Sequence, residues 1–154
     1  TELTASGSVV LELSEGATTG TGSRGGCLHV VNGLNLANSV SVMLHNCTTE
    51  GDSGVGACAS SLGPLVARDN STIVVSDCET LAPGARGAGM ALSELVLRDQ
   101  ASLEVTDAVT TNSEAPGGCI YAASILIYDR AAFTTTRCAT QAWGSPGGAV
   151  YTDA

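Results

Sequence analysis

The six cysteines of this chain are the residues whose type and spacing most directly indicate chemistry. They are Cys27, Cys47, Cys58, Cys78, Cys119 and Cys138. An even number favours disulfides, and six cysteines allow about 15 pairings. A zinc site is the alternative. It is disfavoured because no Cys-x-x-Cys occurs and the two histidines, His29 and His45, lack the spacing of zinc-finger ligands.

Three aspartates recur at a constant spacing and could hold a divalent cation. Asp69, Asp99 and Asp129 lie 30 residues apart, and Asn38 precedes the first by 31. Stacked carboxylates can bind Ca²⁺ between coils, or they can accept hydrogen bonds from turn N–H groups. The turn role is favoured, because arginines directly precede two of the aspartates and the Gly-Gly-x-Gly-x-Asp motif of calcium-binding rolls is absent. We therefore expect no metal and no cofactor.

The same aspartates mark a repeat of 30 or 31 residues. Each copy carries two short apolar segments that alternate with period two, which is typical of β-strands. Gly, Ser, Thr, Asn and Pro follow these segments, as expected for turns. A repeat of this length without a helical pattern predicts an all-β fold, a β-solenoid (β-helix) of about five coils.

The repeat divides the chain into coils of one solenoid domain spanning 1–154. The expected units are a half coil at 1–24, coils at 25–53, 54–86, 87–116 and 117–146, and a half coil at 147–154. The first copy is anchored at Ala5, which places Val9 and Leu11 in the core columns.

The repeat also predicts how the cysteines pair. One column holds Cys27, Cys58, Gly89, Cys119 and Ala149, and the other holds Ser14, Cys47, Cys78, Ala108 and Cys138. The coil that lacks a cysteine in one column lacks it in both, so we expect disulfides within coils: Cys27–Cys47, Cys58–Cys78 and Cys119–Cys138. Each would contribute about 3 kcal/mol by the loop-entropy model. Disulfides imply an oxidising, extracellular or cell-surface location.

The two half coils are complementary. Residues 147–154 followed directly by residues 1–14 align with residues 117–138 without a gap. This predicts either head-to-tail stacking into a homopolymer or one unit of a longer solenoid. The residues expected at the stacking interface are Gly147, Gly148, Val150, Tyr151, Leu3, Val9 and Leu11.

Two sequons, at Asn46 and Asn70, predict covalently attached glycans. Asn70 is the better candidate because it follows an anchor at an expected bend, whereas Asn46 adjoins a predicted half-cystine.

Charge and pattern disfavour several other functions. The net charge is −9, with six arginines and no lysine, which argues against nucleic acid and anionic membranes. No apolar run is long enough for a membrane-spanning helix, so membrane insertion is not expected. Carboxylate ladders, including Asp77 and Asp107, resemble structural columns more than a glycosidase pair, and no Gly-x-Ser-x-Gly occurs. We expect no enzyme and no catalytic residue. A polysaccharide-acting enzyme and an ice-binding protein remain the lesser alternatives.

The segments GGCLHV, GGCIYA and GGAVYT, with Leu44-His45-Asn46 downstream, resemble the repeats of polymorphic outer membrane protein adhesins. More broadly they resemble the right-handed parallel β-helices of autotransporter passengers. The chain departs from that family in carrying Cys where the family has Ala and in lacking a repeated Phe-x-x-Asn. The resemblance implies a surface adhesin. The repeat and its complementary halves favour a structural subunit of an extracellular fibre.

Overall fold

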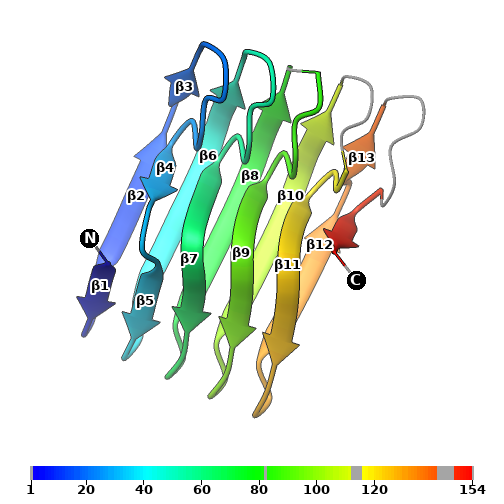
Figure 1. The fold of residues 1–154 in the computed structure, drawn as a ribbon. Helices are drawn as coiled ribbons and strands as arrows, with labels where there is room; N and C mark the ends of the chain where they lie inside the picture. The colour runs from blue at the N-terminus through cyan, green and yellow to red at the C-terminus, as the bar shows by residue number, and fades with distance from the viewer. Residues whose placement is uncertain (1, 82, 112–115, 142–147, 154) are drawn as a thin grey trace.

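The computed structural model describes residues 2–81, 83–111, 116–141 and 148–153, and they form one parallel β-solenoid (Figure 1). One sheet contains β1 (Leu3–Ser6), β4 (Leu28–Val30), β5 (Leu34–Ala37), β7 (Ala59–Ala67), β9 (Met90–Leu97), β11 (Ile120–Ile127) and β14 (Val150–Thr152). The other contains β2 (Val10–Ser14), β3 (Ala17–Thr18), β6 (Ser41–Thr49), β8 (Thr72–Thr80), β10 (Ser102–Thr110), β12 (Ala132–Thr136) and β13 (Ala139–Thr140). Within the described ranges, no helix could span a membrane.

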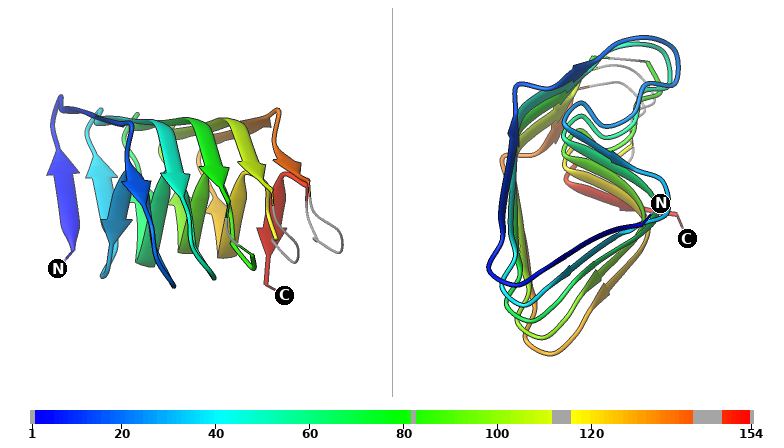
Figure 2. Two further views of the ribbon diagram at one scale, coloured as in Figure 1. Left: turned by 90° about the horizontal axis from the view of Figure 1, so that it is seen from above. Right: turned by 90° about the vertical axis from the view of Figure 1, so that its left-hand side faces the viewer.

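Successive coils stack in register, as the repeat predicts. Every strand pair is parallel, and pairing joins residues one repeat apart, such as Leu65 with Leu95 and Leu95 with Ile125. The sheets run in the orders β1-β5-β7-β9-β11-β14 and β2-β6-β8-β10-β12. Figure 2 shows the coils side by side along the rod and, end on, the outline that they share.

The core lies between the two sheets and consists of columns of aliphatic side chains. One column contains Leu34, Leu65 and Leu95, which are no more than 4% exposed. Val42, Ile73 and Leu103 of the other sheet form a second column and are each 1% exposed. Small branched side chains suit this narrow space, where each packs against its equivalents in the coils above and below.

Left-handed backbone residues turn the chain at two corners of each coil. Asn38, Asp69, Asp99 and Asp129 have φ between 50° and 60°. At the second corner, Glu15, Asn46, Asp77, Asp107 and Arg137 have φ between 51° and 58°. Asn and Asp tolerate this conformation better than most residues with a side chain, which accounts for the aspartate columns. Among the described residues, no group of three or more His, Cys, Asp or Glu could hold a metal ion.

The register of the first coil corrects the sequence alignment by two residues. Leu11 pairs with Val42 and Leu13 with Leu44, whereas an anchor at Ala5 would put Val9 and Leu11 in those places. Gly7, with φ of 90°, therefore takes the corner that Asn38 occupies in the next coil. A shift of two preserves the alternation of inward and outward residues, so the apolar pattern alone could not detect it.

The corrected register also changes one cysteine column. Ala17 pairs with Thr48, so Gly16 rather than Ser14 lies beside Cys47. The gapless join of residues 147–154 to residues 1–14 is likewise two residues out of register.

Three disulfides connect the two sheets within coils, with the pairing that the repeat predicts. They join Cys27 to Cys47, Cys58 to Cys78 and Cys119 to Cys138, with Cα–Cα distances of 5.8, 5.6 and 5.2 Å. The coil between the last two carries Gly89 and Ala108 at the equivalent positions. Three disulfides indicate an oxidising environment.

Candidate interaction surfaces

The first coil leaves part of the apolar core uncovered. Leu3 is 41% exposed, although its equivalent Leu34 is 4% exposed. Val9 is 40% exposed, whereas Val40, one coil further, is 1% exposed. Both side chains belong to inward-facing columns, so their exposure comes from the lack of a coil beyond them in the described structure.

The last coil leaves the core uncovered in the same way. Ile127 is 44% exposed, whereas its equivalent Leu97 is fully buried. Phe133 of β12 also lies at this end, partly buried against the core beside Leu103. The rod thus presents two apolar end faces.

Each end face is stepped, because its outermost strand covers only part of the sheet beneath it. At one end, β14 pairs with Ile120–Ala122 of β11, so no described strand covers the outer edge of Ser124–Ile127. At the other end, β1 covers β5 but not β4.

The expected interface residues are distributed over these faces. Leu3, Val9 and Leu11 lie at the first end face. Val150 and Tyr151 lie in β14 at the other, with the exposed Gly148 just before that strand. Gly147 lies outside the described residues.

Both predicted glycan acceptors are exposed at corners. Asn46 and Asn70 have left-handed φ values of 55° and 60°, and both side chains are exposed to solvent. Asn46 directly precedes Cys47, whose side chain is buried.

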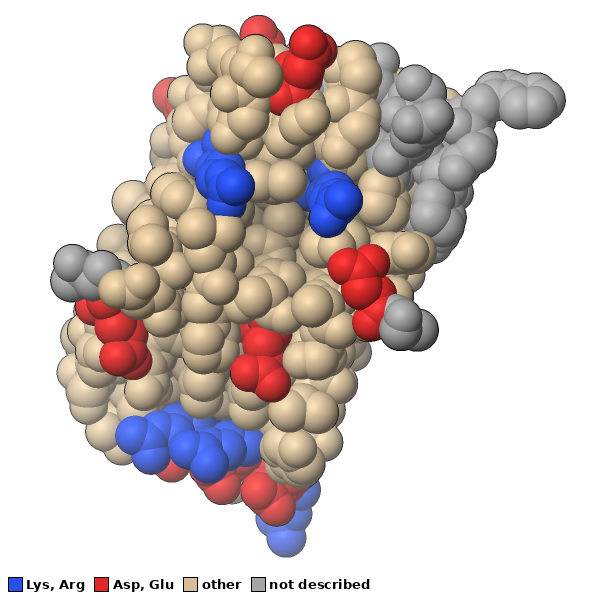
Figure 3. All heavy atoms as spheres, in the orientation of Figure 1, with Lys and Arg blue, Asp and Glu red and all other residues tan. Residues whose placement is uncertain are grey.

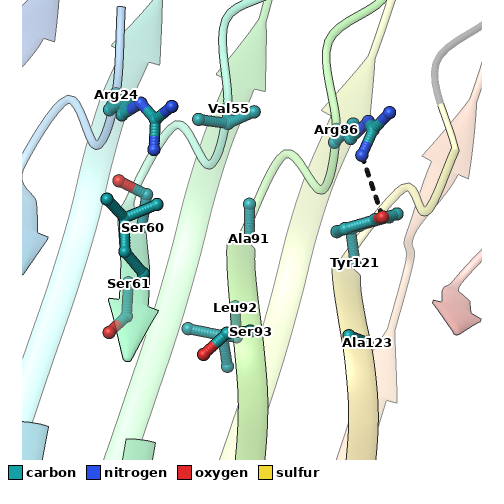
Figure 4. A pocket seen from close by; sticks show the side chains of 11 residues that line it. Arg24, Val55, Ser60, Ser61, Arg86, Ala91, Leu92, Ser93, Tyr121 and Ala123 are labelled. Atoms are coloured by element: carbon teal, nitrogen blue, oxygen red, sulfur yellow. Dashed lines mark hydrogen bonds between the residues drawn. The ribbon is translucent and has the colours of Figure 1, made fainter. Parts of the chain in front are cut away.

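The outer side of the first sheet carries a groove that the sequence patterns did not predict. Its volume is about 340 Å³, and Figure 3 shows the face of the molecule on which it lies. The lining residues are Arg24, Val55, Ser60, Ser61, Leu62, Arg86, Ala91, Leu92, Ser93, Tyr121 and Ala123. In Figure 4, Arg24 and Arg86 extend from the loops over a floor formed by the strands.

A hydrogen-bonded chain orients one of these arginines. Arg86 Nη1 donates to the Tyr121 hydroxyl at 2.9 Å, and its guanidinium lies 4.9 Å from the centre of the tyrosine ring. The Tyr121 hydroxyl in turn donates to Asp153. Burial raises the pKa of Tyr121, and the hydrogen bond to Asp153 raises it further, so the phenol stays protonated and can donate. Tyr151 stacks on Tyr121, with ring centres 5.7 Å apart.

The repeat contained a signal for the two arginines of this groove, though not for the groove itself. Arg24 and Arg86 occupy the same position two coils apart, because both form bridges to Val55. Each directly precedes a glycine. An alignment that tracked cations as well as aspartates would have placed both arginines in one column.

No family model matches this chain, and neither the curated proteins nor the solved structures contain a match to it. The likeness to adhesin repeats therefore rests on short sequence motifs, while the parallel β-solenoid fold rests on the structure.

Proposed function

We propose that this chain is a structural subunit of an extracellular fibre, in which copies stack head to tail and neighbouring copies complete one coil. The observation that carries this proposal is the exposure of inward-facing side chains at both end faces. Leu3 and Ile127 are more than 40% exposed, although their equivalents in the interior coils are nearly or fully buried.

Extending the strand register across the junction predicts the contacts. Leu3 of the next copy would lie beside Ile125, because both belong to the column of Leu34, Leu65 and Leu95. Leu11 of the next copy would lie beside Phe133 by the same rule.

The first sheet would close in the same step. β14 would pair with β4 of the next copy, while β1 of that copy would cover the free edge of β11. Strand β14 of one copy and β1 of the next would thus fill one level of the sheet, two residues out of the register of the gapless sequence join.

Physical chemistry favours such a contact. A bare strand edge presents unpaired N–H and C=O groups, and natural solenoids normally cover it. Two different surfaces meet at each junction, so the contact is heterologous and propagates as an open filament. Stacking would bury the apolar end faces, which is favourable by about 25 cal/mol for each Å² removed from water.

The remaining features fit an extracellular role. The disulfides suit an oxidising compartment. Asn46 and Asn70 lie at exposed corners rather than on the end faces, so glycans there would project from the sides of the fibre. The proposed subunit has no catalytic role.

Electron microscopy of the purified chain tests the proposal. Filaments with an axial repeat of about 24 Å are expected, since five coils rise about 4.8 Å each. Leu3→Asp and Ile127→Asp should each abolish the filaments, because a carboxylate would enter the buried column of the junction.

Matched controls come from outward-facing residues at the same ends. Val10 and Leu126 are 69% and 37% exposed, and their side chains point away from the core. Val10→Asp and Leu126→Asp should leave the filaments intact. Monodisperse particles of wild-type protein would overturn the fibre proposal and favour the alternative, a surface adhesin segment whose adjoining coils belong to the same polypeptide.

A further inference from the structure

We propose that the groove beneath the loops binds a linear acidic saccharide, one that carries carboxylate or sulfate groups. This inference is independent of the fibre role, because the groove lies on the side of the rod and not on an end face (Figures 3 and 4).

The charge distribution is the first argument. The chain has a net charge of −9 and only six arginines, yet two of these line one groove. Neither Arg24 nor Arg86 takes part in the ion pairs found among the described residues, whereas Arg68, Arg98 and Arg137 each pair with an aspartate. Planar guanidinium groups bind carboxylate and sulfate-like oxyanions through paired N–H donors.

The arrangement of the arginines is the second argument. Arg86 is held in place by Tyr121, through a hydrogen bond and a ring contact, so little freedom is lost when it binds an anion. The two arginines are two coils apart along the rod, which corresponds to about 10 Å at the usual strand spacing. One small anion cannot bridge that separation, but a chain with regularly spaced anionic groups can.

The floor of the groove identifies the rest of the ligand. Ser60 and Ser61 lie below Arg24, and Ser93 lies lower and between the two arginines, with small apolar side chains beside them (Figure 4). Ser60 already bonds His29 and Ser61 bonds the Gly63 carbonyl, so both hydroxyls are oriented while keeping free lone pairs. Hydroxyls that line a shallow apolar groove suit the mixed polar and apolar faces of sugar rings. An acidic peptide would share only the charge.

Titration calorimetry with polymers of known chemistry tests the proposal. The probes are polygalacturonate for carboxylates, dextran sulfate for sulfates, dextran as the neutral polymer and poly-glutamate as the acidic peptide. Binding of at least one acidic saccharide is expected, at least tenfold tighter than binding of dextran or poly-glutamate, and the first two probes distinguish carboxylate from sulfate recognition.

Variants locate the binding. The double variant Arg24→Gln/Arg86→Gln should weaken binding at least tenfold. Arg130→Gln should not, because Arg130 lies at a corner beside Asp129, outside the groove. Ala123→Glu keeps both arginines but adds a carboxylate at an exposed position in the groove, and it should also abolish binding.

Several outcomes would overturn the proposal. They are an absence of binding to both acidic saccharides, equal binding of poly-glutamate, and an equal loss of affinity in Arg130→Gln. Circular dichroism of each variant verifies that the solenoid is folded, and Ala123→Glu provides a second test if the double arginine variant does not fold.

Discussion

Gly16 lies in a column that holds cysteine in three other coils, Cys47, Cys78 and Cys138. A Cβ atom added at Gly16 would lie well under 3.0 Å from the backbone of Gly26. The first coil has no room there for a side chain, because the chain returns against it at Gly26.

Gly16→Ser should therefore lower the free energy of unfolding by about 1–3 kcal/mol, the usual cost of overpacking. Ser14→Ala is the matched control. Ser14 is exposed, so its substitution should change the stability by less than about 0.5 kcal/mol. Urea denaturation measures both. If the two substitutions changed the stability equally, Ser14 rather than Gly16 would belong to the cysteine column.

Asp107 and Arg137 form the closest ion pair at the second corner, with Nη2 and Oδ2 2.6 Å apart. Hydrogen bonding to Arg137 lowers the pKa of Asp107. A carboxyl group whose pKa is lower in the folded state stabilises the protein above its unfolded pKa, and that contribution is lost as the pH falls through the folded pKa.

Arg137→Gln should raise the pKa of Asp107 toward its ordinary value and reduce the acid-dependent part of the stability. Carbon-detected NMR of the Asp107 carboxyl measures the shift. Arg130→Gln removes the same charge from the other corner and should leave the Asp107 titration unchanged. An unchanged Asp107 pKa in Arg137→Gln would show that the pair does not form in solution.

At the scale of the elements, the disulfides connect two sheets that also pack without them. The coil with Gly89 and Ala108 keeps the same register as its disulfide-bonded neighbours. The disulfides therefore stabilise this fold without determining the strand register of the coils. They act chiefly by restricting the conformations of the unfolded chain.

The double variant Cys58→Ala/Cys78→Ala should lose about 3 kcal/mol of stability and keep its β-sheet circular dichroism spectrum. Guanidinium denaturation measures the loss. Reduced wild-type protein is the control, and it should lose more because all three disulfides are open. Loss of the sheet signal in the double variant would mean that the disulfide is needed to form the coil.

A bulge in β7 accounts for the one-residue variation in repeat length along the first sheet. The register against β9 shifts between Ser61 and Pro64, so β7 has one residue more than β9 at this bend. Proline has no N–H to donate to the ladder, and bulges are among the few sheet positions that accept it.

At the scale of the whole molecule, the proposed head-to-tail stacking would make stability depend on association. Each junction of the proposed fibre would bury side chains such as Leu3 and Ile127, and whatever binds only the folded state stabilises it by mass action.

The melting temperature of the wild-type chain should therefore rise with protein concentration. Leu3→Asp should melt at a temperature independent of concentration, and Val10→Asp, at an outward-facing site, should behave as wild type. Differential scanning calorimetry over a hundredfold concentration range measures this. A concentration-independent wild-type melt would argue against head-to-tail stacking.

Much of the fold could be predicted from the sequence because a solenoid repeats one local rule. Period-two alternation defined the strands, the spacing of Asp69, Asp99 and Asp129 defined the coils, and the paired absences at Gly89 and Ala108 defined the disulfides. Each of these signals is local or recurs at a fixed interval, so the repeats of this single chain can be aligned with one another.

Only the tertiary structure decided the register of the first coil, the exposure of the end faces and the groove. A two-residue slip keeps Leu11 facing inward, so alternation could not place Gly16 beside Cys47. Arg24 and Arg86 lie on loops of different coils, and the strands of the first sheet form the floor of the groove beside them. The lining side chains come from several coils, so the groove arises from the packing of these coils and no single repeat encodes it.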